Sequence, residues 1–540
     1  MDTKNTPAVS PVEVTFACCR GIWYLPRRQS RTGAIVSQCP SSGQALADLT
    51  GARVLWAEDP SAAALYLQSL GYCKTVFYGD PAAAPEGLPC FPQTEDLNLA
   101  KKELDRFLNK NLSHRENASW LRLDNAAKIY PAALRRNWSS LFRLSVTLTE
   151  PIDKDLMQKA LDLTVRRFPS ICTRLRKGLF WYYLQALDQA PRLSPEYPHP
   201  LTRMPLGQIR QCGLRVIVYE NRLALEIFHS LTDGSGAMIF LKSLLAEYLQ
   251  RKHGITVPTL PDIPDRMEAP RPEELEDSFQ KHGAPKGLSR KQSNAWRLRG
   301  TPEKDGFVNL TCFSLEVDKV RQKAKEYGVG VTAFLGAVMM QALQTLQAEQ
   351  VRNIRKRKSI KVQIPVNLRS LFPSRSLRNF AMYTTPEIQP RLGQYSFREI
   401  CAAVHHRMGL EVNAKHMGMM ITANVSAERV LAVRLMPLFL KNIVMRAVFD
   451  AVGERKYCLA MSNLGKVTLP EVMAPYVRHW DFIVGVQATA PYNCGVVSYG
   501  NELRVNFVRS IRQSGLELHF HKALQELGLQ AQVSSNQSEV

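Results

Sequence analysis

The sequence lacks the motifs that identify several common kinds of catalytic and metal-binding protein. None of its 11 cysteines forms a Cys-x-x-Cys pair, so the spacing of structural zinc sites and dithiol centres is missing. No Gly-x-Ser-x-Gly sequence occurs, which argues against a hydrolase with a serine nucleophile. The pairs His405-His406 and His519/His521 have no cysteine or acidic partner at ligand spacing. We therefore expect free thiols in a reducing compartment and no metal site.

Long apolar runs are also missing. A membrane-spanning helix needs ~20 consecutive apolar residues, and the nearest approach, Val430 to Val452, is interrupted by Arg434, Lys441, Arg446 and Asp450. The first fifteen residues have neither the charged start nor the apolar stretch of a secretory leader. These absences predict a cytoplasmic protein, with peripheral contact at the inner membrane surface as a further option.

Acidic residues are few compared with basic ones. The chain of 540 residues holds 70 Lys+Arg against 48 Asp+Glu, a formal charge of +22. This excess favours an anionic partner, such as nucleic acid, an anionic membrane or a phosphorylated cofactor. Zinc-finger spacing, a basic region followed by heptads and an aromatic RNA-binding signature are all missing, so we expect no nucleic-acid partner.

Composition and periodicity divide the chain into five segments. Residues 1–115, rich in cysteine and in Pro/Ser/Gly connectors, are expected to be an N-terminal extension or a small accessory domain of unknown function. The pattern then becomes regular, with a lobe over 119–270, a Pro- and charge-rich linker or crossover over 271–305, a second lobe over 306–525 and a flexible tail over 526–540.

Helix and strand patterns alternate in both lobes without strict βαβ periodicity, which predicts a mixed α/β (α+β) fold of two lobes. The expected strands are 53–57, 74–78, 139–148, 214–219, 222–229, 307–315, 359–364, 495–498 and 502–508, and the expected helices are 61–70, 151–168, 236–253, 317–327 and 332–347.

The candidate for catalysis is His229, in the run His229-Ser230-Leu231-Thr232-Asp233-Gly234. Alternate side chains of a strand face opposite ways, so the imidazole shares a face with Leu223, Leu225 and Ile227 and points to the apolar side. A carboxylate four residues on, Asp233, begins the following helix. A histidine held in one orientation near a carboxylate can act as a general base.

Taken alone, this short pattern is weak. His229 could equally be a core histidine with its hydrogen bonds satisfied, and Asp233 an ordinary helix N-cap. The surrounding sequence therefore has to decide between the two readings.

The run from His229 to Gly234 resembles the His-x-x-x-Asp-Gly signature of the superfamily of chloramphenicol acetyltransferase, condensation domains and alcohol acyltransferases. Further stretches, in the same order over residues 119–522, resemble the bacterial alcohol acetyltransferase-like branch. They are Tyr130-Pro131-Ala132-Ala133, Asn137-Trp138-Ser139-Ser140, Arg167-Phe168-Pro169-Ser170, Phe180-Trp181-Tyr182-Tyr183-Leu184, Pro365-Val366-Asn367-Leu368-Arg369, Arg378-Asn379-Phe380, Ser462-Asn463-Leu464-Gly465 and Leu469-Pro470. One position departs: many members have two consecutive histidines, and Phe228 stands in place of the first.

The resemblance implies two similar lobes with a tunnel between them, and His229 as the general base at its middle. A hydroxyl or amine would attack the thioester carbonyl of the acyl donor without a covalent acyl-enzyme. Asp233 would be structural and paired with an arginine, for which Arg369 is the candidate, and Gly234 would permit a tight turn. Ser462 or Asn463 is a candidate oxyanion donor, although packing or turn formation explains either residue equally well.

The resemblance leaves the substrates open. The leading hypothesis is an O-acyltransferase that moves an acetyl or longer acyl group from acyl-CoA, a co-substrate and not a bound cofactor, to a small-molecule alcohol. The alternatives are N- or O-transfer from a carrier-protein thioester, or a non-catalytic member that binds an acyl group or a partner. The basic run Arg352, Arg355, Lys356, Arg357, Lys358 and Lys361 could hold phosphates or an acidic carrier protein, or could be a solvated loop. Residues 435–449 suit a helix beside the tunnel or on a membrane surface.

Overall fold

The structure is a computed structural model of the full chain. It describes residues 120–537, apart from 135–139, 188, 267, 284–292, 431–433, 449–453 and 488–489, and six strands of the preceding segment. The chain divides into two compact units, Met1–Ser119 with Asp265–Pro270, and Trp120–Pro264 with Arg271–Val540.

The first unit is described by its strands alone. Two of them, β4 and β5, fall where the sequence predicts strands, whereas the helix expected over 61–70 lies outside the described residues. β4 pairs with β1 and β2, and β5 pairs in parallel with β3 and β6. The strands are β1 (Ala17–Cys18), β2 (Gly21–Leu25), β3 (Ala34–Ser37), β4 (Arg53–Trp56), β5 (Thr75–Gly79) and β6 (Cys90–Pro92).

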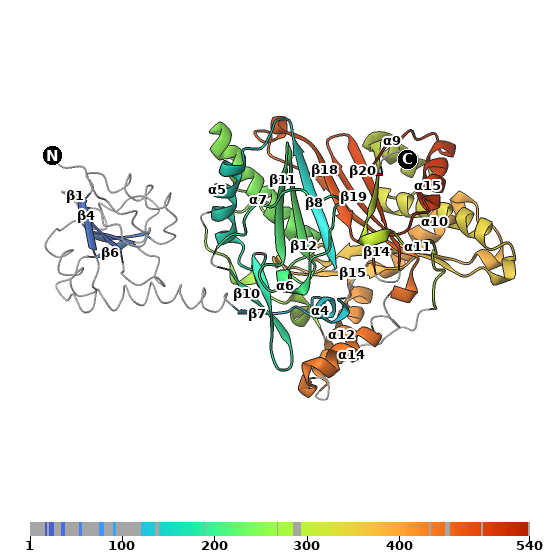
Figure 1. Ribbon diagram of the computed structural model, residues 1–540, viewed down its shortest axis with the longest axis horizontal. Coiled ribbons are helices and arrows are strands. Elements are labelled where there is room, and N and C mark those ends of the chain that lie inside the picture. Colours follow the sequence, from blue (N-terminus) through green and yellow to red (C-terminus); the bar gives the residue numbers. More distant parts are fainter. Residues whose placement is uncertain are drawn as a thin grey trace. The chain divides into compact units, whose positions relative to one another are not determined.

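In the second unit, a four-stranded sheet has the order β11-β12-β8-β18 (Figure 1). Its strands are β8 (Leu141–Leu148), β11 (Leu214–Tyr219), β12 (Arg222–Phe228) and β18 (Val477–Val484). The hairpin β11–β12 matches the sequence prediction closely. Two long helices, α5 (Lys154–Arg167) and α7 (Gly234–His253), pack against one face and bury their apolar stripes there. Each begins at an aspartate N-cap, Asp153 and Asp233.

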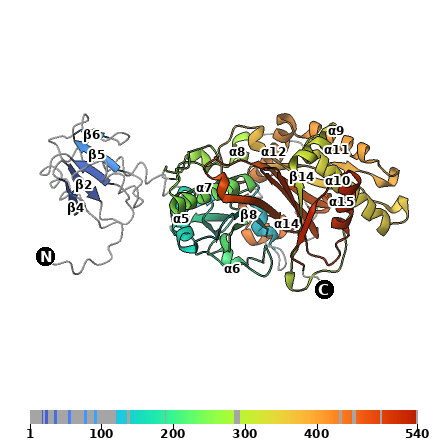
Figure 2. The ribbon, with the colours of Figure 1, turned by 90° about the horizontal axis from the view of Figure 1, so that it is seen from above.

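A larger sheet lies beside it, in the order β15-β14-β17-β19-β20-β13-β21, with β16 added on β14. Helices cover one face of this sheet and enclose a second apolar core (Figure 2). The strands are β13 (Asn309–Glu316), β14 (Ile360–Asn367), β15 (Ala381–Thr384), β16 (Glu387–Ile388), β17 (Leu459–Val467), β19 (Tyr492–Tyr499), β20 (Glu502–Arg509) and β21 (Gln532–Ser535). The helices are α9 (Val317–Glu326), α10 (Val331–Gln350), α11 (Phe397–Glu411) and α15 (Gly515–Glu526).

Smaller elements gather at one end of the two sheets (Figure 1). They include a three-stranded sheet of order β7-β10-β9 and a third apolar cluster around Phe279, Phe380 and Met417. These elements are β7 (Trp120–Arg122), β9 (Thr173–Lys177), β10 (Tyr182–Ala186), α4 (Ile129–Ala133), α6 (Leu206–Ile209), α8 (Ser278–His282), α12 (Ala414–Arg429) and α14 (Leu438–Val448). Within the described part of the chain, no single helix is both long and apolar enough to cross a membrane.

Two of the predicted segments differ from the structure. The segment 306–525 does not form the second lobe alone, because β18 pairs antiparallel with β8 and completes the first sheet. The tail 526–540 is not flexible throughout, since β21 pairs with β13 and Asn536 Oδ1 accepts a hydrogen bond from Leu310 N at 2.7 Å. The expected linker or crossover 271–305 stays a prediction, and within it Glu274 forms an ion pair with Arg167.

The two sheets are joined by close backbone contact at Gly495 of β19. A Cβ atom at this position would lie 2.1 Å from the carbonyl oxygen of Phe482 in β18. A polar contact joins β18 to the next strand of the larger sheet, because Asn506 Nδ2 of β20 donates to Phe482 O at 3.2 Å. The glycine is therefore needed for the approach of the two sheets and not for its backbone conformation.

We predict that Gly495→Ala destabilises the protein by about 1–3 kcal/mol, the usual cost of overpacking, because the clashing atom is backbone and cannot rotate away. Urea unfolding of the full chain measures the change. Gly409→Ala is the control, since its Cβ meets nothing within 4 Å on α11. Equal stability of the two variants would show that the sheets can separate there without cost.

Candidate functional site

His229 lies directly after β12, where the strand turns toward α7. Its backbone N–H donates to Ser140 O at 3.0 Å, which continues the pairing of β12 with β8 by one residue. The imidazole stacks on Tyr130 of α4 at a centroid distance of 4.7 Å and meets the edge of Phe142 at 5.0 Å. The side chain is only partly buried. The ring is therefore held between two aromatic side chains and is still accessible.

One ring nitrogen of His229 is fixed by an amide. Nδ1 lies 3.1 Å from Asn379 Oδ1, and Asn379 Nδ2 donates to Asp124 Oδ2 at 3.2 Å. The same Asp124 oxygen accepts the Asn379 backbone N–H, so it acts as an acceptor and orients the amide with Oδ1 toward the ring. Nδ1 must then carry the proton and donate to Asn379, which leaves the lone pair on Nε2.

Asp124 itself is fully buried. Burial raises the pKa of its carboxyl, while Arg378 and the N–H donors of Ala127 and Asn379 oppose that rise. No sequence pattern points to Asp124, and Asn379 stands in the sequence analysis only as part of Arg378-Asn379-Phe380. Both residues are separated from their partners by long stretches of chain, so no local pattern joins them.

Burial lowers the pKa of His229 below its ordinary value of 6.5. Its hydrogen bond to its own backbone, the nearby Asp233, Asn379 and Asp124 oppose this effect without reversing it. The imidazole is therefore neutral at pH 7, which is the form that can accept a proton.

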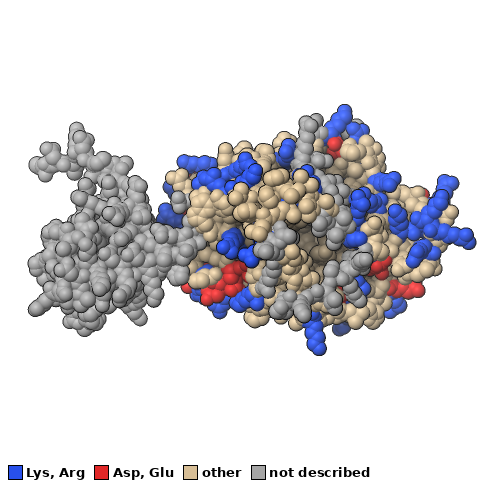
Figure 3. Space-filling view, turned by 90° about the horizontal axis from the view of Figure 1, so that it is seen from below, with Lys and Arg blue, Asp and Glu red and all other residues tan. Residues whose placement is uncertain are grey.

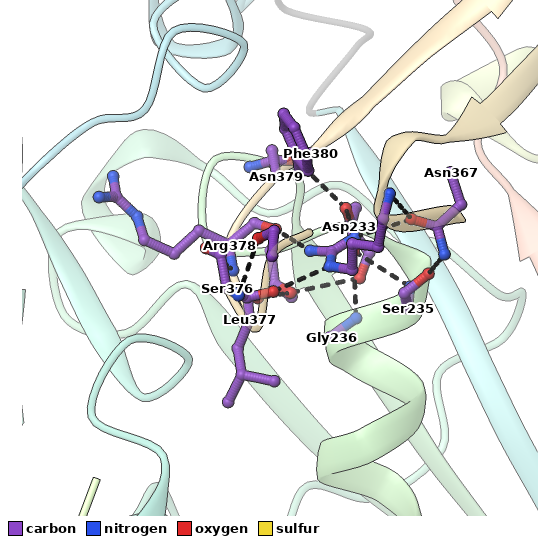
Figure 4. A network of polar contacts seen from close by, with 12 residues as sticks. Asp233, Ser235, Gly236, Asn367, Ser376, Leu377, Arg378, Asn379 and Phe380 are labelled. Atoms are coloured by element: carbon purple, nitrogen blue, oxygen red, sulfur yellow. Dashed lines mark hydrogen bonds and ion pairs between the residues drawn. The ribbon is translucent and has the colours of Figure 1, made fainter. Parts of the chain in front are cut away.

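Asp233 joins three segments of the chain through one carboxylate (Figure 4). Oδ1 accepts the N–H groups of Ser235 and Gly236, both at 3.1 Å, and so caps α7. Oδ2 accepts from Arg369 Nη1 at 2.7 Å and from Phe380 N at 2.9 Å. The arginine named from the sequence is thus the one that contacts Asp233.

Gly234 of the motif is not needed for the tight turn that was expected of it. Gly234 begins α7 and does not have a positive φ, so it is not required for a left-handed turn. A Cβ there would meet Leu464 Cδ2 at 2.6 Å, a flexible side-chain end. The stricter position is Gly236, where a Cβ would lie 2.3 Å from Leu377 O. The sequence did not single out Gly236.

The structure places Ser462 and Asn463 on β17 and distinguishes between them. Asn463 Nδ2 donates to Thr332 Oγ1 at 3.0 Å, and Asn463 Oδ1 accepts from Gly465 N at 2.8 Å, where β17 has a bulge. Its amide thus stabilises the turn. Ser462 is partly buried, and its hydroxyl has no hydrogen-bond partner among the described residues, which leaves it available for a ligand.

The basic run lies at the other end of β14 from the Asp233 contacts. Ile360 and Asn367 bound this strand, and seven steps of ~3.3 Å separate them by about 23 Å. Lys361 is unavailable to a ligand because it is buried and paired with Glu387 Oε2 at 2.9 Å. Arg352, Arg355, Lys356 and Lys358 are exposed. No cluster of metal-ligating side chains occurs among the described residues.

Residues 289–385 match the family model of alcohol acetyltransferases. This stretch includes Arg369, Asn379 and Phe380, which contact the histidine motif. The matched stretch is 97 of the 540 residues. It lies within the part of the chain whose motifs resemble the alcohol acetyltransferase-like branch.

Solved structures support the expected two-lobed fold of the chain. F. sporotrichioides TRI101 complexed with coenzyme A and T-2 is similar over 76% of this chain and 99% of its own, at 10% identity and a TM-score of 0.51. The trichothecene 15-O-acetyltransferase TRI3 from Fusarium sporotrichioides is similar over 76% of this chain and 94% of its own, at 10% identity and a TM-score of 0.50. No curated protein matches in sequence. At such identities the likeness establishes the two-lobed fold.

We predict that Arg369→Met destabilises the protein by about 3–5 kcal/mol, because it leaves the buried Asp233 carboxylate without its cation. Urea unfolding at pH 7 measures the loss. The double variant Asp233→Asn/Arg369→Met should recover part of it, since the amide is neutral. If the double variant were as unstable as the sum of the two single variants, the two side chains would not act as a pair.

Proposed function

We propose that this acyltransferase moves an acetyl or longer acyl group from acyl-CoA to the hydroxyl of a small-molecule alcohol, with His229 as the general base. The observation that carries the proposal is the contact of Nδ1 with Asn379, which leaves the Nε2 lone pair on a partly exposed, neutral ring. The match to alcohol acetyltransferases supports a hydroxyl acceptor. A fold relative that binds coenzyme A supports a CoA thioester as the donor.

The proposed reaction has two steps. The acceptor hydroxyl gives its proton to Nε2 as its oxygen attacks the thioester carbonyl, which forms a tetrahedral oxyanion. The oxyanion then collapses to the ester, the C–S bond breaks, and the thiolate takes the proton from the imidazolium to leave as free CoA. No covalent acyl-enzyme forms.

Other residues position these groups. Asp124 and Asn379 hold the ring in the tautomer that exposes the Nε2 lone pair. Asp233 is not in contact with the ring as a hydrogen-bond partner and acts by holding Arg369 and Phe380 against the start of α7. Ser462 is the candidate oxyanion donor, because its hydroxyl is available whereas the Asn463 amide is engaged within the turn.

We predict that His229→Gln lowers kcat by about 10²–10⁴-fold, the usual contribution of a general base. Thiol release from acetyl-CoA and longer acyl-CoAs, with panels of alcohols and amines, measures the rate. His405→Gln is the matched control, since His405 is exposed on α11.

Three results would contradict the proposal. Full acceptor-dependent activity in a folded His229→Gln variant would remove the base role. Transfer to amines alone would remove the alcohol acceptor. Binding of acyl-CoA without turnover under any of these conditions would leave a non-catalytic acyl-binding protein.

We predict that Asn379→Leu lowers kcat by about 10–100-fold, by analogy with the loss of other groups that orient an imidazole. The hydrogen bond that Nδ1 donates to Asn379 Oδ1 favours the protonated ring, so its removal lowers the pKa of His229 further. The acid limb of kcat/KM, which for the native enzyme lies below pH 6.5, should therefore move to lower pH. pH–rate profiles measure this shift, with Asn424→Leu on α12 as the control. An unchanged limb with a lower kcat would indicate a purely structural role.

A further inference from the structure

The helix α14 has its polar and apolar faces the opposite way round from an ordinary surface helix. Lys441 is buried on the side that packs against the protein, together with Leu438. Phe439 is 67% exposed and Ile443 64% exposed on the other side, with Leu440 and Val444 beside them. A helix of a soluble domain normally presents the reverse arrangement.

Specific polar contacts fix this orientation. Lys441 Nζ donates to Phe180 O at 2.9 Å and lies 3.3 Å from the ring centroid of Trp181. Asn442 Nδ2 donates to Tyr182 Oη at 3.0 Å. Rotation of the helix to bury its apolar side would break these bonds, leave the Phe180 carbonyl without its donor and move the Lys441 ammonium away from Trp181. These contacts therefore hold α14 with its apolar side facing outward.

Further exposed apolar residues lie next to α14, on the adjoining loop and in the chain just before the helix. The loop between β9 and β10 lies against the start of α14, since Leu438 N donates to Leu179 O at 3.0 Å, and it exposes Leu179 and Phe180. The resulting apolar face consists of Leu179, Phe180, Val430, Leu435, Phe439, Leu440, Ile443 and Val444. It holds eight of the large apolar side chains that the described residues expose, which single scattered residues would not explain.

Basic side chains lie at the edges of the apolar face. Glu428, two residues before Val430, is the acidic residue beside it and is paired with Lys128. Neither residues 173–186 nor residues 430–447 contain an Asp or Glu, and Lys177, Arg434 and Arg446 are exposed there. Figure 3 looks onto this side of the molecule and shows many Lys and Arg but few Asp and Glu. An apolar helix face with basic residues at its edges suits the surface of an anionic bilayer.

Charge also weighs against two other occupants. Residues 1–119 hold 12 Lys+Arg and 12 Asp+Glu, so that segment is neutral and offers no complementary charge. The whole excess of +22 lies in residues 120–540. A second copy would bring two basic rims together, and like charges at a contact are unfavourable.

We propose that the apolar face of α14 and the β9–β10 loop docks the protein on an anionic membrane surface. The apolar side chains enter the boundary between headgroups and acyl chains, and Lys177, Arg434 and Arg446 contact the anionic headgroups. Docking places the site near the bilayer, because Arg446 Nη2 donates to Leu134 O at 2.9 Å beside α4, whose Tyr130 stacks on His229.

The test is co-sedimentation of the full chain with vesicles of phosphatidylcholine alone and with 30% phosphatidylglycerol, each at ~50 mM and ~500 mM salt. We expect binding to the anionic vesicles that weakens in high salt. Phe439→Asp/Ile443→Asp should lower the vesicle partition coefficient at least tenfold. Leu392→Asp/Leu410→Asp is the matched control, since both leucines are exposed elsewhere.

Thermal unfolding of each variant shows whether it folds, and thiol release with a short acyl-CoA and a water-soluble alcohol should be unchanged. Absence of vesicle binding, or equal binding by Phe439→Asp/Ile443→Asp and the native chain, would overturn the proposal. So would self-association of the native chain in sedimentation velocity that this variant abolishes while vesicle binding persists, since the face would then belong to a second copy. Vesicle binding and sedimentation velocity do not depend on the proposed acyl transfer, so failure of the docking proposal and failure of the proposed function are distinguishable.

Discussion

The Asp233 carboxylate is the contact on which the arrangement of the site depends. A single buried carboxylate accepts hydrogen bonds from the first turn of α7, from the Arg369 guanidinium and from the backbone of Phe380. Charge-assisted hydrogen bonds of this kind are stronger than neutral ones and fix geometry as well as energy. The N-terminus of α7, which packs on the first sheet, is thereby joined to Arg369, which follows β14, and to Phe380, which precedes β15 of the second sheet.

The contacts of Asp233 also determine where the general base, His229, is held. Asn379 precedes Phe380, so holding the Phe380 N–H also holds the amide that contacts Nδ1 of His229. Asp124 fixes that amide from the other side. Two carboxylates therefore determine the orientation of the imidazole without either bonding to it, and neither favours the protonated ring enough to overcome its burial. A base that stays neutral at pH 7 results from this arrangement.

Local sequence patterns predicted much of the fold. The hairpin β11–β12, the helices α5 and α7 and the pair β19–β20 were all expected from alternation, helical periodicity and turn residues, because each is decided by neighbours in sequence. The exchange of β18 into the first sheet was not expected, since its pairing with β8 joins residues more than 300 positions apart. The last strand, β21, was missed for the same reason, because its short polar sequence is placed only by β13.

The residues of the site divide in the same way, into those that local sequence predicts and those that only distant contacts explain. His229, Asp233 and Arg369 came from residue type and from the resemblance, and the contact of Asp233 with Arg369 is present. The role of Asn379 and Asp124 depends on which amide atom faces the ring, which no pattern encodes. Gly236 was missed because its reason is the carbonyl of Leu377, again from a distant segment.

The sequence of α14 does not determine which side of the helix faces the protein, and only tertiary contacts decide it. Apolar residues interspersed with cations fitted either a core helix or a surface helix, and burial of Lys441 against Phe180 and Trp181 decides which side faces inward. A lysine is costly to bury unless its ammonium is bonded and lies over an aromatic ring, and both conditions are met here. The same loop that binds Lys441 continues into β10, which pairs with β7 just before Asp124. The exposed apolar face and the orientation of the base thus depend on adjoining parts of one small layer of structure.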